Sequence, residues 1–426
     1  MDIVRHRYLE HLKVRMNNGL IKVITGIRRS GKSHLLFNQF KKYLLESGVP
    51  QKNIISAALD DDVFKKLRDP QELSSFVRAK VKSTKQRYYV LLDEIQMAIS
   101  AEELANPLMS KEIYSVLNGF LHLENVDVYV TGSNSRFLSK DVLTEFRGRG
   151  DEVHVLPFVF SEFMQGYSGD AYHGWADYMT FGGLPLILSF RTDEQKVRYL
   201  KNLFEETYLK DIVSRNGIAK TQELENLIDI LASSVSSLTN ASKICQTFKS
   251  VYHSEIGLNT VKKYMDCLDD AFMTSSAKRF DVKGRKYIVT PLKYYFEDIG
   301  LRNARLNFRQ NEENHIMENV IYNELRYRGY NVDVGVVEKN IKIDGKSKRV
   351  SYEIDFVATL GSAKYYIQSA FNVSNYEKSE QEKNSLINVS DSFKKIVVVK
   401  DVVKPNYDEH GILTIGLFDF LLGDIV

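Results

Sequence analysis

Hydrophobic residues fall into runs and periodic patterns that divide the chain into regions. Short β-rich runs at 22–25, 88–92 and 126–130 predict strands, the second of them buried, and apolar residues at helical spacing predict a helix over 34–45. Residues 161–215 continue with apolar positions at helical spacing. The first half of the chain therefore predicts an α/β core followed by a helical segment.

The pattern changes after residue 223 to short helices and then a hairpin. Asn240 and Asn259 are predicted N-caps, because an Asn side chain accepts a hydrogen bond from a free N–H group at a helix start. The predicted elements are helices at 241–248 and 260–268 and strands at 271–280 and 286–290. Helix, turn, helix and hairpin in this order predict a winged helix-turn-helix.

From residue 315 the predicted order is helix, strand, strand, helix, strand. The clearest elements are a helix at 318–328 and strands at 350–359, 365–371 and 396–399. This order predicts a second α/β region at the C-terminus.

Composition is that of a globular protein with several cores. The 426 residues are 43% hydrophobic and 27% charged, which argues against a disordered or low-complexity chain. The net charge is only +3, but residues 241–290 hold nine Lys and Arg against five Asp and Glu, a local charge of +4. The near-neutral total therefore does not argue against DNA binding by the middle region.

Targeting signals are not evident in the sequence. The N-terminus has no apolar core of signal-peptide length, and Asp419 and Asp424 interrupt the apolar stretch at 411–426. Cys245 and Cys267 fall on apolar helical faces and resemble reduced core residues. We therefore predict a cytoplasmic protein without a membrane span.

Residues 26–33 match the phosphate-loop pattern G-x-x-x-x-G-K-[ST] at every fixed position. Gly26 and Gly31 allow a tight turn that points backbone N–H groups at phosphate oxygens. Lys32 is predicted to reach the β- and γ-phosphates and Ser33 to ligate Mg²⁺, at the N-terminus of the helix that follows. The predicted nucleotide-binding residues are Gly26, Ile27, Arg28, Arg29, Ser30, Gly31, Lys32, Ser33 and His34.

Two acidic residues follow the apolar run at 88–92, as in a Walker B strand. Asp93 is predicted to hold Mg²⁺ through water, and Glu94 to polarise the attacking water. An ordinary strand that ends in acidic residues is the alternative, and the phosphate loop makes it the weaker one.

Polar residues on two later turns are candidates to complete the site. At the end of the next strand we favour Asn134 as the γ-phosphate sensor, with Ser133 or Thr131 as alternatives. A Gly-flanked turn then carries Arg147 and Arg149, candidates for an arginine finger in cis or from a neighbouring subunit, and we favour Arg149. No guanine-reading Asn-Lys-x-Asp motif follows any strand, so ATP is predicted rather than GTP.

Together these motifs resemble one group of prokaryotic AAA+ ATPases. The resemblance rests on the phosphate loop, the Leu-Asp-Glu-Ile-Gln run at 92–96, the Thr-Gly-Ser-Asn tip at 131–134 and Gly148-Arg149, and it continues through 156–163 and 181–185. It implies a P-loop AAA+ parallel sheet core, a helical lid, ATP and Mg²⁺, and a C-terminal domain of unknown function.

The predicted fold class is therefore α/β, with four domains in sequence. They are an AAA+ ATP-binding core at 1–160, a helical lid at 161–220, a winged helix-turn-helix at 221–305 and a C-terminal nuclease-like domain at 306–426. Three lid arginines are candidates to reach the nucleotide, without a choice among them: Arg191, Arg198 and Arg215.

The predicted winged helix has two interpretations. If it reads DNA, the helix at 260–268 would enter the major groove. The possible DNA-binding residues are Lys262 and Lys263 on this helix and Lys283, Arg285 and Lys286 on the wing. Three aspartates crowd the helix end at 266–270, and the alternative is a winged helix that packs against protein.

The C-terminal strands resemble the restriction-endonuclease-like fold, whose enzymes place Asp on one strand and Glu-x-Lys on the next. Asp355 is present, but Gln368 and Ala370 stand where Glu and Lys are needed. Neutral Gln is a poor Mg²⁺ ligand, and catalysis needs an intact metal site. Three other residues could supply a carboxylate but not the lysine: Glu318, Glu324 and Glu353. We therefore predict a degenerate recognition or assembly domain without nuclease activity.

The sequence as a whole predicts an ATP-binding and ATP-hydrolysing AAA+ protein that couples nucleotide state to DNA or to a partner protein. The expected cofactors are ATP and Mg²⁺. The expected partners are double-stranded DNA through the winged helix, an unidentified protein and a second copy of the chain in a homo-oligomer. The alternatives are a nucleotide-gated scaffold or regulator with little turnover and, less favoured, an ATP-dependent nuclease.

Overall fold

The structure, a computed structural model, describes residues 3–106, 109–133, 148–310, 312–343, 346–371 and 383–423. The chain divides into two compact units. The first comprises residues 1–157, 214–217 and 270–272, and the second comprises 158–213, 218–269 and 273–426. None of the helices in the described part of the chain has the length and apolar content needed to cross a membrane.

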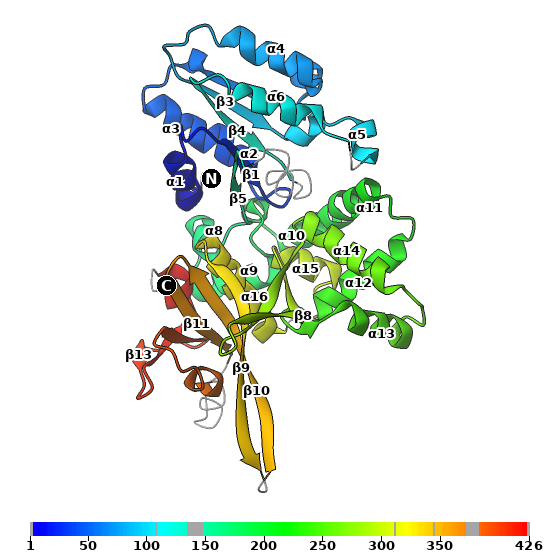
Figure 1. The fold of residues 1–426 in the computed structure, drawn as a ribbon, viewed down its shortest axis with the longest axis vertical. Helices are drawn as coiled ribbons and strands as arrows, with labels where there is room; N and C mark the ends of the chain where they lie inside the picture. The colour runs from blue at the N-terminus through cyan, green and yellow to red at the C-terminus, as the bar shows by residue number, and fades with distance from the viewer. Residues whose placement is uncertain are drawn as a thin grey trace. The chain divides into compact units, whose positions relative to one another are not determined.

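A five-stranded parallel sheet in the order β2-β3-β4-β1-β5 forms the centre of the first unit (Figure 1). Its strands are β1 (Ile21–Thr25), β2 (Ile54–Ala58), β3 (Tyr88–Asp93), β4 (Val126–Thr131) and β5 (Gly150–His154). Every residue of β1, β3 and β4 is buried. The three strands predicted from short β-rich runs are therefore confirmed, and all their residues are buried because both faces of the sheet are covered.

Helices cover the two faces of this sheet. On one face α4 and α6 pack into an apolar core with side chains of β1, β3 and β4. On the other face Phe40 of η1 packs on Tyr129 of β4, with 4.6 Å between the ring centroids, and η1 contacts α1. The helices of this part are α1 (His6–Val14), α2 (Lys32–His34), η1 (Leu35–Phe40), α3 (Lys41–Glu46), η2 (Gln51–Asn53), η3 (Asp62–Arg68), α4 (Pro70–Lys80), η4 (Ile95–Ala98), α5 (Ala101–Ala105) and α6 (Glu112–Phe120). The helix predicted at 34–45 is confirmed, because α2, η1 and α3 follow one another without a break.

Helices fill the chain from residue 160 to 233, as the periodicity of 161–215 predicted. They are α8 (Phe160–Gly166), α9 (Ala171–Phe181), η6 (Pro185–Ser189), α10 (Asp193–Leu203), η7 (Phe204–Leu209), α11 (Lys210–Asn216) and α12 (Thr221–Ser233). The later helices are α13 (Ala241–Val251), α14 (Leu258–Asp270), α15 (Ile299–Arg305), α16 (Glu313–Tyr327) and α18 (Leu417–Leu422). Their assignment to a lid and to a winged helix stays a prediction.

A nine-stranded mixed sheet in the order β13-β14-β12-β11-β10-β9-β7-β8-β6 forms the centre of the second unit. Its strands are β6 (Leu238–Thr239), β7 (Thr274–Asp281), β8 (Lys286–Phe296), β9 (Asn331–Ile343), β10 (Lys346–Leu360), β11 (Ala363–Ala370), β12 (Lys394–Val399), β13 (Asn406–Tyr407) and β14 (Ile412–Gly416). The predicted hairpin pairs β7 with β8, and β7 also pairs in parallel with β9. The hairpin and the C-terminal strands therefore belong to one continuous sheet.

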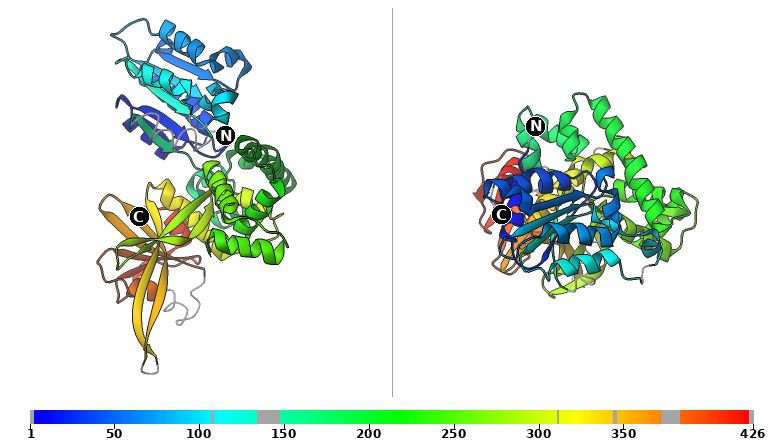
Figure 2. Two further views of the ribbon diagram at one scale, coloured as in Figure 1. Left: turned by 45° about the vertical axis from the view of Figure 1, so that its right-hand side comes forward. Right: turned by 90° about the horizontal axis from the view of Figure 1, so that it is seen from above.

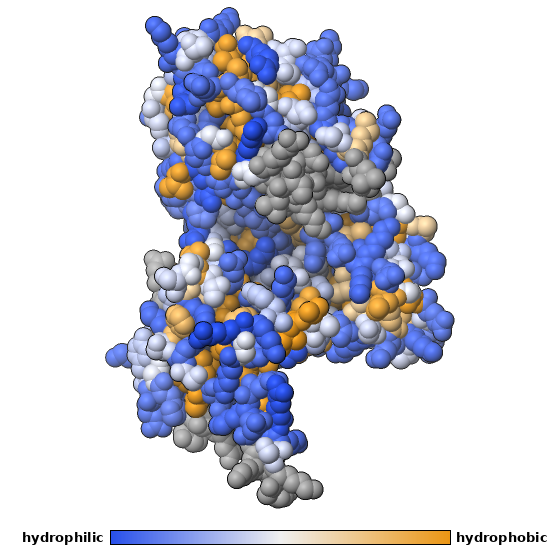
Figure 3. Space-filling view, viewed as in Figure 1, coloured by the Kyte–Doolittle hydropathy of each residue, from blue (hydrophilic) through white to orange (hydrophobic). Residues whose placement is uncertain are grey.

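Strands β9 and β10 form a long antiparallel ribbon that extends beyond the rest of this sheet (Figures 1 and 2). Hydrophilic side chains dominate the coloured surface of the ribbon in Figure 3. Its exposed residues include Lys339, Asn340, Ser347, Lys348 and Arg349. The sequence pattern predicted part of β10 but did not predict β9 or the length of the ribbon.

The two predicted N-caps have different outcomes. The Asn240 side chain accepts a hydrogen bond from the backbone N–H of Lys243 at 2.8 Å, so it caps α13 as predicted. The prediction for Asn259 is wrong, because α14 begins at Leu258 and Asn259 lies in its first turn. The carbonyl of Gly257 accepts the first bond of that helix, from the N–H of Val261 at 3.1 Å, so the helix starts earlier than the side-chain pattern suggested.

The Phe-Gly-Gly-Leu-Pro segment at 181–185 is a close backbone crossing within the second unit. A Cβ atom on Gly183 would lie 2.0 Å from the Phe158 carbonyl oxygen, and one on Gly300 would lie 2.0 Å from the Phe181 carbonyl oxygen. The buried Asp298 carboxylate accepts hydrogen bonds from the N–H groups of Gly183 and Leu301, at 2.9 Å each. Glycine is required here because no side chain fits between the crossing segments.

Candidate nucleotide-binding site

The phosphate loop connects β1 to α2, and its backbone has the sharp turns that the glycines allow. Gly26 and Gly31 have φ values of 138° and 94°, and Arg29 also has a positive φ of 63°. A Cβ atom on Gly26 would lie 2.1 Å from the carbonyl oxygen of Val155, directly after β5. The loop is therefore closely packed against the end of the neighbouring strand.

Lys32 is buried within this loop. Its ammonium group donates hydrogen bonds to the carbonyl oxygens of Gly26 at 2.9 Å and Ile27 at 2.8 Å. The other predicted nucleotide-binding residues differ in exposure: Ile27 and Ser30 are buried, Arg28 is half-buried, and Arg29, Ser33 and His34 are exposed. The lysine side chain thus folds back onto the loop and binds its backbone.

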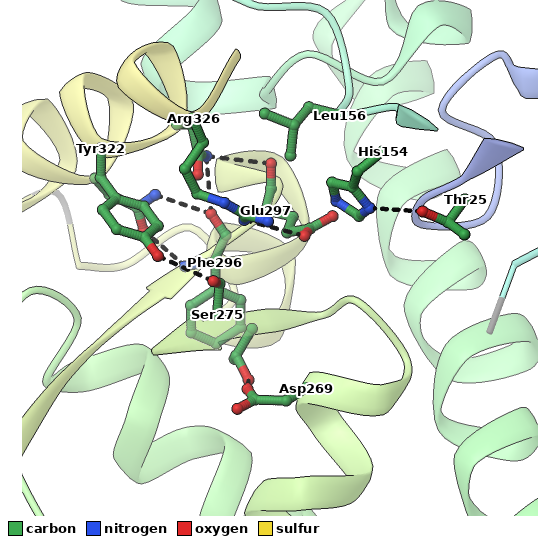
Figure 4. A network of polar contacts seen from close by, with 12 residues as sticks. Thr25, His154, Leu156, Asp269, Ser275, Phe296, Glu297, Tyr322 and Arg326 are labelled. Atoms are coloured by element: carbon green, nitrogen blue, oxygen red, sulfur yellow. Dashed lines mark hydrogen bonds and ion pairs between the residues drawn. The ribbon is translucent and has the colours of Figure 1, made fainter. Parts of the chain in front are cut away.

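Polar contacts that sequence reasoning missed hold the phosphate loop and the strands beside it. The Thr25 hydroxyl, at the end of β1, lies 3.1 Å from His154 Nδ1 (Figure 4) and donates to the Glu152 carboxylate at 2.5 Å. The buried Arg5 guanidinium donates to the Ser30 carbonyl oxygen at 2.9 Å. Arg5 lies at the N-terminus, far from any motif in sequence, and no local pattern distinguishes it from a solvated arginine.

Asp93 lies where the carboxyl ends of three neighbouring strands meet. It ends β3, beside β4 and close to the loop that follows β1. Its carboxylate accepts a hydrogen bond from the Thr131 hydroxyl of β4, and the Ser33 hydroxyl of the phosphate loop lies close enough to lower its pKa. Burial raises the pKa of Asp93, and the two hydroxyl groups oppose that rise. A hydroxyl and a carboxylate in contact provide the oxygen ligands that Mg²⁺ prefers.

Glu94 is held by its backbone and by a neighbouring amide. Its φ is 53°, in the left-handed region, and its N–H donates to the Thr131 hydroxyl at 3.0 Å. The Gln96 amide donates to the Glu94 carboxylate and lies 3.5 Å from the Ser133 hydroxyl. Gln96 belongs to the Leu-Asp-Glu-Ile-Gln run, but sequence reasoning gave it no role.

The remaining candidates for completing the site are placed unequally. Asn134, the favoured sensor, and Arg147 lie outside the described residues. Arg149 is exposed, and its carbonyl oxygen accepts a hydrogen bond from the N–H of Ile21 at 2.8 Å. Of the two alternative sensors, Thr131 contacts both acidic residues, whereas Ser133 contacts Gln96.

The candidate DNA-binding residues are all exposed. Lys262 and Lys263 lie on α14, and Lys262 lines a cavity of about 380 Å³ that it shares with Val289 and Thr290 of β8. The other three, Lys283, Arg285 and Lys286, lie at the turn between β7 and β8. The Lys283 ammonium donates to the Glu338 carbonyl oxygen at 3.2 Å, so this turn adjoins the β9–β10 ribbon.

The two strands that resemble a nuclease site are neighbours in the sheet. β10 carries Asp355 and pairs antiparallel with β11, which carries Gln368 and Ala370. The Gln368 side-chain oxygen accepts hydrogen bonds from the Asp355 N–H at 3.3 Å and from the Ser385 hydroxyl at 3.4 Å. Gln368 therefore supports the backbone of the strand beside it. Glu324, another candidate carboxylate, forms an ion pair with Arg328 at 2.8 Å.

Sequence reasoning missed a buried lysine in this part of the sheet. Lys293 of β8 forms ion pairs with Glu318 of α16 and with Glu353 and Asp355 of β10. Burial lowers the pKa of Lys293, but the three carboxylates outweigh it and hold that pKa well above its usual value. Burial and the charge of Asp355 raise the pKa of Glu318, and the ammonium group of Lys293 opposes that rise. Figure 4 draws other polar pairs of this unit, including Ser275 with Tyr322 at 3.0 Å.

Comparison with known proteins gives the following similarities. Residues 18–164 match a family described as an AAA domain, and residues 172–312 match a domain of unknown function (DUF8612). An uncharacterized protein of Haemophilus influenzae is 31% identical over 425 residues, which cover 99% of this chain and 98% of that protein. Uncharacterized protein MJ1544 of Methanocaldococcus jannaschii is 25% identical over 390 residues, which cover 87% of this chain and 79% of that protein. Among solved structures, the ORC1 protein of Aeropyrum pernix in complex with DNA is 12% identical, with a TM-score of 0.29, over 72% of this chain and 93% of that one.

Proposed function

Since the chain belongs to the AAA+ family of P-loop ATPases, we propose that it binds ATP with Mg²⁺ in the phosphate loop and hydrolyses it. The observation that carries this proposal is the proximity of the two halves of the site. The Ser33 hydroxyl of the phosphate loop lies close enough to Asp93 of β3 to lower the pKa of that carboxyl group, and Glu94 follows Asp93 directly. These residues are the ones that phosphoryl transfer to water requires.

Each residue has a distinct role in the proposed reaction. Ser33 and Asp93 would hold Mg²⁺, which would neutralise charge on the phosphates. Lys32 exchanges its bonds to the loop carbonyls for bonds to phosphate oxygens. Glu94, oriented by Thr131 and Gln96, accepts a hydrogen bond from the attacking water and polarises it.

Two substitutions test this assignment. Lys32→Ala removes the phosphate ligand, so we expect loss of ATP binding in equilibrium titration. Glu94→Gln keeps the size and hydrogen-bonding capacity of the side chain but not its charge, so we expect ATP binding without turnover. Normal hydrolysis by the Glu94→Gln variant would overturn the role proposed for Glu94.

We also propose that the second unit couples nucleotide state to DNA or to a partner protein. Five exposed Lys and Arg residues on α14 and at the β7–β8 turn, together with basic residues of the β9–β10 ribbon, favour DNA. Pull-down with the Glu94→Gln protein and ATP, followed by identification of the bound nucleic acid or protein, separates these two partners.

The alternative is a nucleotide-gated scaffold with little turnover. It uses the same residues to bind ATP and differs in the rate of hydrolysis. Steady-state turnover that stays negligible with every added DNA or partner would favour the scaffold over the ATPase.

The arginine finger is proposed to be Arg149, which is exposed on the first unit. A finger supplied by a second copy predicts that Lys32→Ala chains mixed with Arg149→Ala chains recover part of the activity. Absence of rescue, together with a monomer by light scattering, would contradict a finger that acts between copies.

A further inference from the structure

Lys293 places an ammonium group at the centre of an acidic cluster. Its side chain is 4% exposed, and its Nζ atom lies 2.8 Å from Glu318, 2.9 Å from Glu353 and 3.1 Å from Asp355. A lysine ammonium has three N–H donors. Two of them are donated to Glu318 and Asp355, and Glu353 forms an ion pair with the same ammonium group, so three carboxylates surround one cation.

The cluster is assembled from three separate elements. Lys293 comes from β8, Glu318 from α16, and Glu353 and Asp355 from the same face of β10. The Glu318 Oε1 atom also accepts a hydrogen bond from the buried Tyr295 hydroxyl at 2.8 Å. These contacts join two regions of the sheet and a helix through one buried cation.

The carboxylates of this cluster are already engaged. The second oxygen of Asp355 accepts a hydrogen bond from the Ser369 N–H at 3.0 Å. The amide of Gln368, at the position of the second nuclease acid, is directed to the Asp355 N–H and to Ser385. Asp355 therefore has both oxygens bonded, and Glu318 and Glu353 each meet Lys293 with one oxygen, Oε1.

A divalent ion does not fit beside this ammonium. Mg²⁺ requires oxygen ligands at about 2.0–2.1 Å, and the point from which these carboxylates could be reached together is held by Lys293. Within the described ranges, no group of three or more His, Cys, Asp and Glu side chains is arranged to hold a metal ion. The metal chemistry that the nuclease-like resemblance implies is therefore not supported by the residues present.

We propose that the Lys293 ammonium is the resident cation of this cluster and takes the place of a divalent metal ion. The C-terminal region then keeps an acidic constellation as a structural connection rather than as a nuclease site. A neutral side chain at position 293 would leave three carboxylates around one point without a cation. Replacement of Lys293 should convert the cluster into a divalent-cation site.

The test is a calorimetric titration of the full-length protein with Mn²⁺. All proteins carry Asp93→Asn, which removes the carboxylate proposed to hold Mg²⁺ in the phosphate-loop site. The parent should show no binding that depends on Asp355, and Lys293→Met should gain one Mn²⁺ site with a dissociation constant at least about tenfold lower than any in the parent. Lys293→Met with Asp355→Asn should lose that site.

Two results would overturn the proposal. One is a Mn²⁺ site in the parent that disappears with Asp355→Asn, and the other is a folded Lys293→Met protein that gains no site. If Lys293→Met does not fold without metal, Lys293→Met with Glu318→Gln leaves two carboxylates and less repulsion, and the same titration applies to it. Metal-dependent cleavage of plasmid DNA by the wild-type protein that is lost in Lys293→Met would identify Lys293 as a catalytic lysine instead, and would also overturn the proposal.

Discussion

Thr131 contacts both acidic residues of the nucleotide site at once. Its hydroxyl donates to the Asp93 carboxylate and accepts a hydrogen bond from the Glu94 N–H at 3.0 Å. Thr131→Val keeps the shape but removes both bonds, so we expect ATP turnover to fall about 10- to 100-fold, with a smaller change in nucleotide affinity. Steady-state hydrolysis and equilibrium titration measure the two effects. Thr131→Ser, which keeps the hydroxyl, should restore turnover, and wild-type turnover in the Val variant would contradict a positioning role.

Asp298 makes the stability of the second unit depend on pH. Burial raises the pKa of this carboxyl group to about 6, and the N–H groups of Leu301 and Gly183 oppose that rise. Because the folded pKa exceeds the usual aspartate value of 3.8, the folded state holds the proton more tightly, and stability falls as pH rises from about 4 through 6. The slope is at most about 1.4 kcal/mol per pH unit.

Asp298→Asn removes this titration and leaves a side chain of the same shape. Its free energy of unfolding should therefore improve relative to the wild type as pH rises from 4 to 7, by up to about 3 kcal/mol. Urea denaturation of both proteins across this range measures the difference. A difference that does not change with pH would contradict the raised pKa.

At the scale of elements, the crossing at 181–185 should be among the least tolerant positions of the chain. Gly183→Ala would place a Cβ atom 2.0 Å from the Phe158 carbonyl oxygen, so the two segments must move apart. We expect a loss of at least about 2 kcal/mol in the free energy of unfolding. Gly257→Ala is the matched control, because its nearest new contact is at 3.6 Å and it should cost less than about 1 kcal/mol. Equal effects in denaturant melts would contradict a close crossing.

The elements that could be predicted from the sequence are those whose cause is local. Short β-rich runs predicted β1, β3 and β4, whose residues are all buried because both faces of that sheet are covered. The start of α14 could not be predicted, because the backbone of Gly257 rather than the side chain of Asn259 begins the helix. Strand β9 was not predicted although Val332, Val334 and Val336 alternate along it, and the outer part of the ribbon gave no signal because its residues, such as Lys339, Asn340, Ser347 and Lys348, are polar and exposed.

The same distinction applies to the candidate sites. The phosphate loop is one contiguous segment, and Asp93 and Glu94 directly follow a strand run. The residue types and their spacing within each segment therefore indicated nucleotide binding. Lys293 could not be found this way, because its partners Glu318 and Asp355 lie 25 and 62 positions away along the chain. The only sign of it in the sequence was indirect. Ala370 stands where the nuclease pattern needs a lysine, and carboxylates that become buried need a compensating cation from another part of the chain.

Across the whole molecule, charge is distributed unevenly although the total is small. The net charge is +3, yet 241–290 alone carries +4, and its candidate DNA-binding residues are all exposed. Basic residues Lys339 and Lys348 on the adjoining ribbon extend the same sign of charge. A chain that is nearly neutral overall can therefore present a positive surface to a phosphate backbone.

If this surface binds DNA, charge reversal there must weaken binding and reduce its salt dependence. Lys262→Glu with Lys263→Glu should lower affinity for duplex DNA and make the slope of log affinity against log salt less steep. With fewer phosphate contacts, fewer counterions are released when the protein binds. Lys65→Glu with Lys66→Glu is the control, since it makes the same change in net charge at two exposed lysines of the first unit. Fluorescence anisotropy at several salt concentrations measures both quantities. Equal losses in the two double variants would show that net charge alone governs binding, and affinity that ignores salt would argue for a protein partner.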